Sequence, residues 1–255
     1  SGCVETGCFG RENYSLTGYF NLPKVLIAAL NGGSPMDTWE EAFQAYRSQL
    51  NHFIDIKIRG NRRIEELYSK FLPAPFLSCL IDDCIERGMD YHSGGARYDT
   101  SYIQGVGLGT ITDSLSSLKK HVFQDQTVDL EGMLSALASD FQGEERLRQI
   151  CINRTPRYGN DDDRADEIMR GVVESFFEAV DGRPNTRGGC YRINMLPTTC
   201  HVYFGSVTGA TPDGRHAGKP FSEGISPVQG ADRKGPTAVL LSASKMDHSL
   251  TGGTL

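Results

Sequence analysis

The sequence of 255 residues has no long apolar run and no excess of positive charge. Without an apolar stretch of about eighteen residues, a membrane-spanning helix is not expected. The net charge of −6 offers too little basic surface for nucleic acid or an anionic membrane, because both are bound through clustered lysine and arginine. The densest basic group, Arg59 with Arg62 and Arg63, is better explained as a solvated helix face. We therefore expect neither nucleic acid nor a membrane as a partner.

Cysteine spacing of the kind found in metal and redox sites is also missing. The seven cysteines are an odd number without the spacing of a disulfide framework. Cys3 and Cys8 are five positions apart, as are Cys79 and Cys84, whereas zinc and redox sites typically use C-x-x-C. The pattern favours reduced cysteines in the cytoplasm and predicts no bound metal.

Neither end carries the signals of a natural terminus. The chain opens with Ser1-Gly2-Cys3 rather than methionine, and the basic and apolar regions of a signal peptide are missing. It stops at Leu255 with no signal that ends the last element. We interpret the sequence as an internal fragment of a longer protein.

Helical patterns dominate the first two thirds of the chain, and short apolar runs follow. The glycines among the first twenty residues and at Gly105, Gly107 and Gly109 predict loops. The expected helices cover 23–30, 37–68 (opened by a capping box of Asp37 and Glu40), 111–122, 129–137, 144–150 and 161–180. The segment 76–85 is helix or buried strand, and the expected strands cover 191–196, 200–204 and 237–241. This mixture predicts an α/β or helix-rich fold.

Three groups of residues have a structural explanation that outweighs a functional one. The stretch 105–109 has neither the spacing of a dinucleotide loop nor the lysine of a phosphate loop, so a glycine-lined turn is the better interpretation. His201 and His216 have no carboxylate or second histidine at ligand spacing, which favours a hydrogen-bonded or surface histidine. The three aspartates at 161–163 suit the first turn of a helix better than a cation site.

The run Cys3-Val4-Glu5 is different, because an extended backbone would point the thiol and the carboxyl group to the same side. A nucleophilic cysteine needs a base that makes thiolate, and a carboxylate has the opposite effect because its charge raises the thiol pKa. The pair makes sense where the sulfur abstracts hydrogen atoms and the carboxyl group moves protons. On spacing alone, this motif is weak.

The residues around Cys3-Val4-Glu5 strengthen the interpretation of this run as a hydrogen-abstracting site. The stretches Ser1–Gly10 and Leu16–Asn21 resemble the active-site cysteine loop of glycyl radical enzymes of the pyruvate formate-lyase type. Further matches to that family follow in the expected order at Gly95–Tyr98, Gly105–Gly107, Thr112–Leu115, Tyr158–Asp161, Gly209–Arg215, Gly224–Pro227 and Gly235–Ala238. The resemblance covers essentially the whole chain, and the motifs are specific as a set.

The resemblance implies a barrel of two five-stranded half-sheets ringed by helices, with a cysteine loop and a glycine loop at its centre. Residues 1–255 would then be part of this catalytic domain, beginning at the cysteine loop and ending before the radical glycine. It further implies no bound cofactor, a protein-based glycyl radical, a homodimer in the cytoplasm and a small-molecule substrate. The partner that installs the radical is expected to be an activating enzyme with S-adenosylmethionine and an iron–sulfur cluster.

Details of the motifs narrow the activity that the resemblance implies. A single loop cysteine, Cys3, departs from the cysteine pair of the acyltransferases, and Thr6 stands where the choline, glycerol and diol enzymes usually have proline. Tyr19 and the segment 195–204 resemble the branch that dehydrates trans-4-hydroxy-L-proline to pyrroline-5-carboxylate. In that branch Cys3 would abstract hydrogen, Glu5 would act as acid and base, and Tyr19 would line the pocket. Thr198 or Thr199 would contact the substrate.

Alternatives stay open at this point. They are a radical decarboxylase of a 4-hydroxyphenylacetate-like acid, another glycyl radical diol or glycerol dehydratase, and a formate C-acetyltransferase of the pyruvate formate-lyase type. A truncated product that serves as a scaffold or decoy is the non-enzymatic alternative. The fragment alone is expected to be inactive, because the radical glycine lies outside it in each enzymatic case.

Overall fold

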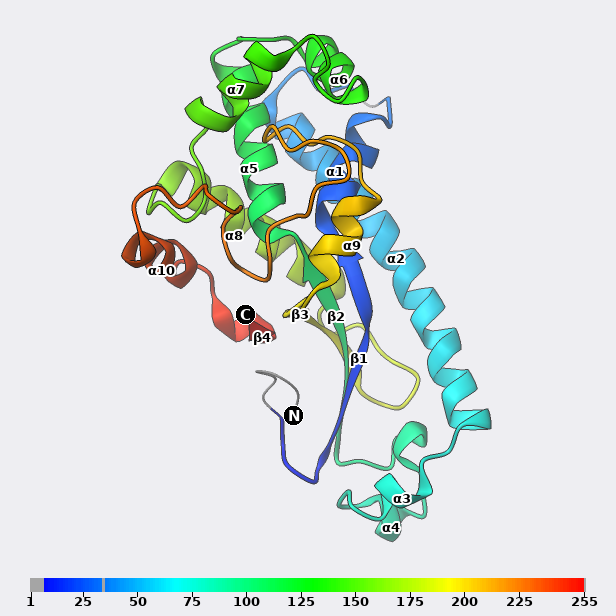
Figure 1. Cartoon of the computed structure of the whole chain (residues 1–255). Coiled ribbons are helices and arrows are strands. Elements are labelled where there is room, and N and C mark those ends of the chain that lie inside the picture. The colour runs from blue at the N-terminus through cyan, green and yellow to red at the C-terminus, as the bar shows by residue number, and fades with distance from the viewer. Residues whose placement is uncertain (1–6, 34, 255) are drawn as a thin grey trace.

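The computed structural model describes residues 7–33 and 35–254, which build on a four-stranded parallel sheet (Figure 1). The strands are β1 (Glu12–Asn21), β2 (Tyr98–Val106), β3 (Cys190–Met195) and β4 (Thr251–Thr254). They stand in the sheet in the order of the chain, so each is paired in parallel with the next. Parallel pairing requires long crossovers, and helices supply them.

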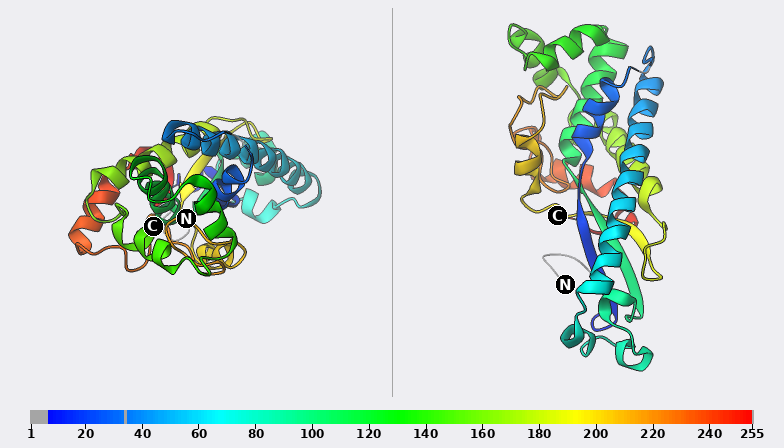
Figure 2. Two further views of the ribbon diagram at one scale, coloured as in Figure 1. Left: turned by 90° about the horizontal axis from the view of Figure 1, so that it is seen from above. Right: turned by 90° about the vertical axis from the view of Figure 1, so that its right-hand side faces the viewer.

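Four helices form the core together with the sheet: α1 (Leu22–Leu30), α2 (Trp39–Phe71), α5 (Leu108–Leu118) and α8 (Asp163–Val180). α2 and α8 run alongside the strands on one side of the sheet, whereas α1 and α5 continue from the carboxyl ends of β1 and β2 (Figures 1 and 2). α5 follows β2 directly and is buried on all sides, whereas α2 and α8 are amphipathic and bury one apolar stripe each. Burial of the aromatic and branched side chains of this layer is the main source of stability.

The remaining segments are short. They are α3 (Pro75–Ser78), α4 (Cys84–Arg87), η1 (Tyr91–Ser93), η2 (Lys119–Gln124, a π-helix), α6 (Leu130–Ala138), α7 (Glu145–Arg154), α9 (Cys200–Ser206), α10 (Pro236–Ser244) and η3 (His248–Leu250). α9 lies on the opposite side of the strands from α2 (Figure 2). None of the helices in the described part of the chain combines the length and the apolar character that crossing a bilayer requires.

Most of the expected helices are confirmed, and their caps follow local rules. Asp129 accepts a hydrogen bond from the backbone of Gly132, and the aspartate run opens α8 with Asp162 as its N-cap. The capping box of α2 lies one residue later than the sequence predicts. Thr38 and Glu41 form it, rather than Asp37 and Glu40.

Four expected elements are wrong. The first twenty residues are not all loop, because β1 begins at Glu12. Gly105 belongs to β2, where Phe176 and Met195 leave no room for a side chain, and Gly109 belongs to α5. The segments 200–204 and 237–241 are helices α9 and α10 instead of strands, and Leu240 in α10 is 69% exposed rather than buried.

Candidate functional site

The face of the sheet that points away from the core helices is polar and aromatic. Successive strand residues alternate between faces, so the side chains that share the side opposite the core can be read from the register. They include Tyr14, Tyr19, Tyr102, Gln104 and Asn194, which we call the polar face. Leu16, Thr100 and Arg192 lie on the same side by register. The side chains on the opposite face of the sheet pack against the helices, and they include Ser101, Ile103, Tyr191 and Ile193. A buried sheet with one polar side indicates that this side faces a site rather than a core.

An irregularity in β1 aims Tyr19 onto the polar face. The register shifts between Leu16 and Tyr19, so that Tyr19 pairs with Gln104 and Phe20 with Gly105. Gly18 in this bulge has φ +110°, and the Lys57 ammonium donates a hydrogen bond of 2.9 Å to the Thr17 carbonyl. Without the extra residue, Tyr19 would point into the core. The bulge therefore positions the tyrosine that the sequence singled out, and its side chain is 37% exposed.

A Gly18→Ala substitution should disturb this bulge. Alanine at φ +110° is strained, and we expect a loss of about 1–3 kcal/mol in folding stability. In the full-length protein this should appear as a lower thermal midpoint. Gly60→Ala, in the middle of α2 with open space around it, is the matched control and should raise the midpoint. An unchanged midpoint in the Gly18 variant would show that the bulge does not depend on glycine.

Aromatic stacking and close backbone approach build the polar face. The Tyr14 and Tyr102 rings are stacked with centroids 4.1 Å apart, and the Asn194 side-chain amide donates a hydrogen bond of 2.8 Å to the Tyr14 hydroxyl. The backbone of β4 passes so close to the Tyr102 ring that any side chain at Gly252 would collide with it. Burial raises the pKa of Tyr102, so its phenol stays protonated near neutral pH.

The two predicted threonines follow β3 at the carboxyl edge of the sheet, the edge toward which Tyr19 also lies because the strands are parallel. Thr198 has φ +46°, a left-handed conformation that is rare for a branched residue and is common at functional sites. Its carbonyl lies 3.0 Å from Nδ1 of His201, and Thr199 is the N-cap residue of α9. His201 is therefore buried and hydrogen-bonded, as expected.

The second histidine that the sequence singled out, His216, is partly exposed, and its Nδ1 lies 3.1 Å from a carboxylate oxygen of Asp140.

On the helix side, Glu65 of α2 holds the same strands in place. Its carboxylate accepts hydrogen bonds from the hydroxyls of Ser101 (2.6 Å) and Tyr191 (2.9 Å), and from the backbone of Thr186 (3.0 Å). Burial alone would raise the pKa of Glu65, but the hydrogen bonds from Ser101 and Thr186 and the charge of Arg187 outweigh it and lower the pKa. Glu65 is therefore ionised and ties α2 to β2 and β3.

Three of the sequence motifs meet in one buried ion cluster. Asp113 accepts a hydrogen bond of 2.9 Å from the Arg157 side chain and another of 2.9 Å from the backbone of Tyr158. Arg157 also lies 3.6 Å from Asp213, which accepts a hydrogen bond of 2.6 Å from Thr211. The motifs at 112–115, 158–161 and 209–215 are thus scaffold, since they fasten α5 to the loops that follow α7 and α9.

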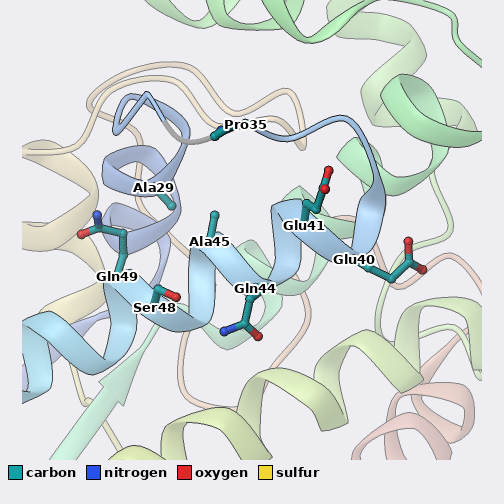
Figure 3. Close-up of a pocket in the computed structure, with 8 residues that line it drawn as sticks. All are labelled: Ala29, Pro35, Glu40, Glu41, Gln44, Ala45, Ser48 and Gln49. Carbon is teal, nitrogen blue, oxygen red and sulfur yellow. The ribbon is translucent and has the colours of Figure 1, made fainter.

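A pocket of about 590 Å³ lies elsewhere, between the end of α1 and the first turns of α2 (Figure 3). Glu41, one of its lining residues, already accepts hydrogen bonds from the backbones of Asp37 (2.9 Å) and Thr38 (3.0 Å). The pocket belongs to the helix start and is separated from the polar face by the core. It is not a candidate active site.

Cys3 and Glu5 lie outside the described residues, so their predicted roles stay predictions.

The sequence alone did not indicate three residues of the polar face, Tyr14, Gln104 and Asn194. A signal for Asn194 existed, because polar residues alternate with apolar ones in 191–195 as they do in half-buried strands. Within residues 7–33 and 35–254, no cluster of histidine, cysteine and carboxylate side chains is arranged to hold a metal.

Comparison with known proteins places this geometry in a family. Residues 1–205 match the pyruvate formate lyase-like family model, and residues 221–255 match the glycine radical family model. The prediction that the radical glycine itself lies beyond residue 255 is not tested by these matches.

Individual relatives agree with the family match. Trans-4-hydroxy-L-proline dehydratase of Clostridioides difficile is 52% identical over the whole chain, which covers 34% of that relative, and a probable dehydratase of Escherichia coli K12 is 33% identical, with 35% covered. The crystal structure of the C. difficile hydroxyproline dehydratase with trans-4-hydroxy-L-proline bound superposes with a TM-score of 0.97 at 52% identity, over all of this chain and 34% of that one. The B12-independent glycerol dehydratase of Clostridium butyricum gives 0.95 at 34% identity, with the same coverage. This chain spans about a third of the length of these relatives. It belongs to the pyruvate formate lyase-like family, and its α/β fold is part of the glycyl radical enzyme barrel.

Proposed function

We propose that the full-length protein is a glycyl radical dehydratase that converts trans-4-hydroxy-L-proline to pyrroline-5-carboxylate and water. The observation that carries the proposal is the 52% identity along the whole chain to a hydroxyproline dehydratase, against 31–34% for the sulfopropanediol and isethionate enzymes of the family. The bulge that turns Tyr19 onto the polar face supports it, since this tyrosine is one of the residues that carry the resemblance.

The proposed reaction begins when the Cys3 sulfur, as a thiyl radical, takes a hydrogen atom from the ring carbon next to nitrogen. Glu5 protonates the hydroxyl on the neighbouring carbon, which leaves as water. The ring nitrogen gives up a proton as the C=N bond forms, and the radical moves to the carbon that lost the hydroxyl. Cys3 returns its hydrogen atom to that carbon. The sum is substrate minus one water, and the thiyl radical is regenerated.

The polar face would form one wall of the site in this reaction. Tyr19 lines the pocket, and Thr198 or Thr199 contacts the substrate from the carboxyl edge of the sheet. Enclosure by the rest of the barrel excludes water and other hydrogen donors that would quench the radical. The fragment without those walls is proposed to be inactive.

The partners follow from the same chemistry. The radical is proposed to come from an activating enzyme that uses S-adenosylmethionine and an iron–sulfur cluster, so the protein itself needs no bound cofactor. A homodimer in the cytoplasm completes the proposal.

Anaerobic activation of the full-length protein, followed by incubation with trans-4-hydroxy-L-proline, tests the activity. We expect pyrroline-5-carboxylate from the activated protein and none from the unactivated control. Carbon dioxide from 4-hydroxyphenylacetate, or an aldehyde from glycerol or propanediol, with no turnover of hydroxyproline, would contradict the substrate assignment and leave the family unchanged.

A further inference from the structure

A pocket away from the polar face is lined mainly by basic side chains. It has a volume of about 310 Å³ and opens where the end of α7, the start of α8 and the loop before α10 meet (Figure 1). Its charged lining residues are one acid, Asp162, and five bases, Arg154, Arg157, Arg164, Arg233 and Lys234. The chain as a whole carries a net charge of −6, so the positive surplus is local. A concave site with clustered cations favours an anionic ligand.

Two of the five bases are already paired with carboxylates. The Arg164 guanidinium donates hydrogen bonds of 2.9 and 2.6 Å to the two carboxylate oxygens of Asp162. Arg157 is shared between Asp113 and Asp213 in the buried ion cluster, which offsets its charge. The attraction for an anion must therefore come from the other three bases.

These three, Arg154, Arg233 and Lys234, are exposed and pair with no carboxylate in the described part of the chain. The Arg233 guanidinium donates one hydrogen bond of 2.9 Å, to the neutral side chain of Asn153. The side chains of Arg154 and Lys234 form no hydrogen bond with another described residue. Like charges around one pocket repel each other, so an anion between them gains charge-assisted hydrogen bonds and relieves that repulsion.

The loop that carries two of these bases is held in place by the buried side chain of Asn160. The Asn160 amide nitrogen donates a hydrogen bond of 2.7 Å to the Ala231 carbonyl. Its amide oxygen accepts a hydrogen bond of 3.2 Å from the backbone of Lys234. The wall of the pocket is therefore formed without a ligand, which lowers the cost of ordering when one binds.

We propose that this pocket binds a phosphate dianion, free or carried on a small molecule, through Arg154, Arg233 and Lys234. Guanidinium groups match phosphate oxygens with paired hydrogen bonds, and lysine adds a compact charge. The volume lies at the lower end of the range for ligand pockets, which suits a small molecule rather than a macromolecule. This site is separate from the proposed substrate site and does not depend on which substrate the enzyme uses.

The bound phosphate would join two parts of the chain. Lining residues 152–164 belong to the part that matches the pyruvate formate lyase-like model, and residues 231–234 belong to the part that matches the glycine radical model. A ligand that contacts both parts stabilises their packing, in proportion to its concentration relative to its dissociation constant.

Calorimetric titration of the unactivated full-length protein with inorganic phosphate tests the site. The buffer is an amine, and sodium chloride keeps the ionic strength constant. We expect saturable binding that is about 10–100-fold weaker in the double variant Arg233→Gln, Lys234→Gln. The matched control is Arg62→Gln, Arg63→Gln, which removes the same charge from two exposed neighbours in α2 and should keep the affinity within about twofold.

Glycerol 3-phosphate distinguishes the two sources of the phosphate group. It should compete with inorganic phosphate for the same site, whereas uncharged glycerol should not. Tighter binding of the ester than of inorganic phosphate would identify an ester as the ligand, and weaker binding would identify free phosphate. Competition by glycerol at the same concentration would contradict recognition of the phosphate group.

Lack of phosphate binding by the full-length protein would overturn the inference, and so would equal weakening in both double variants, because the effect would then follow net charge alone. Lys234→Gln by itself separates binding from folding. Its side chain has no hydrogen-bond partner among the described residues, so the thermal midpoint without ligand should stay unchanged while phosphate binds more weakly. A lower midpoint together with lost binding would assign Lys234 a structural role instead.

Discussion

A Cys3→Ser variant of the full-length, activated protein is expected to lose turnover of trans-4-hydroxy-L-proline by at least about a thousandfold. The physical reason is that a serine O–H bond is much stronger than a cysteine S–H bond. A glycyl radical can therefore take a hydrogen atom from the thiol, whereas the corresponding step with a hydroxyl is strongly uphill. Product formation in an anaerobic assay measures the loss, and the electron paramagnetic resonance signal of the glycyl radical should persist because its formation does not require Cys3.

Cys8 supplies the matched control, since it is another cysteine five residues further on and is exposed. Cys8→Ser should keep turnover within a small factor of the original protein. Turnover at the original rate in the Cys3 variant would remove the hydrogen-abstracting role from this residue. Loss of the radical signal as well as turnover would point to a defect in activation instead.

Removing the arginine of the buried ion cluster should have the largest effect on stability. Arg157→Ala leaves Asp113 and Asp213 facing each other in the interior without their shared cation, and breaking a buried pair in this way costs about 3–5 kcal/mol. The thermal midpoint of the full-length protein measures the effect. Arg154→Ala, an exposed arginine three residues earlier, should change stability by no more than about 0.5 kcal/mol.

The defect in the Arg157 variant should also depend on pH. Burial raises the pKa of Asp113 to about 6 even with Arg157 beside it, and without that cation the pKa must rise further. A carboxyl group whose folded pKa lies above its unfolded pKa of about 4 destabilises the fold once it ionises. The destabilising effect grows as pH rises from the unfolded pKa to the folded pKa and is constant above it. In the variant the folded pKa lies above about 6, so the additional loss develops above about pH 6. The midpoint of the variant should therefore fall further below the original at pH 8 than at pH 5.5. An equal deficit at both values would show that Asp113 does not carry the effect.

The parts of the fold that were predicted are those that depend on local chemistry. Asp129 caps its helix with its own side chain, and the apolar stripe of α8 repeats with helical period, so both were visible in the sequence. The segment 200–204 is rich in residues that favour strands, but the left-handed turn at Thr198 redirects the chain into α9. Pro236 suits the first turn of α10, although the apolar run after it resembles a buried strand.

The site was harder to predict, because it depends on register between strands that are far apart in sequence. Nothing near Gln104 indicates that it lies opposite Tyr19 and beside Asn194, and the pairing of Tyr19 depends on a single extra residue in β1. The resemblance supplied Tyr19 and the threonines after β3.

The central claim is that the polar face of this sheet forms a wall of the substrate site. A crystal structure of the unactivated full-length protein with trans-4-hydroxy-L-proline bound tests it most directly. We predict the substrate within contact distance of Tyr19. Substrate bound at a distance from Tyr19 and from the rest of the polar face would contradict this placement.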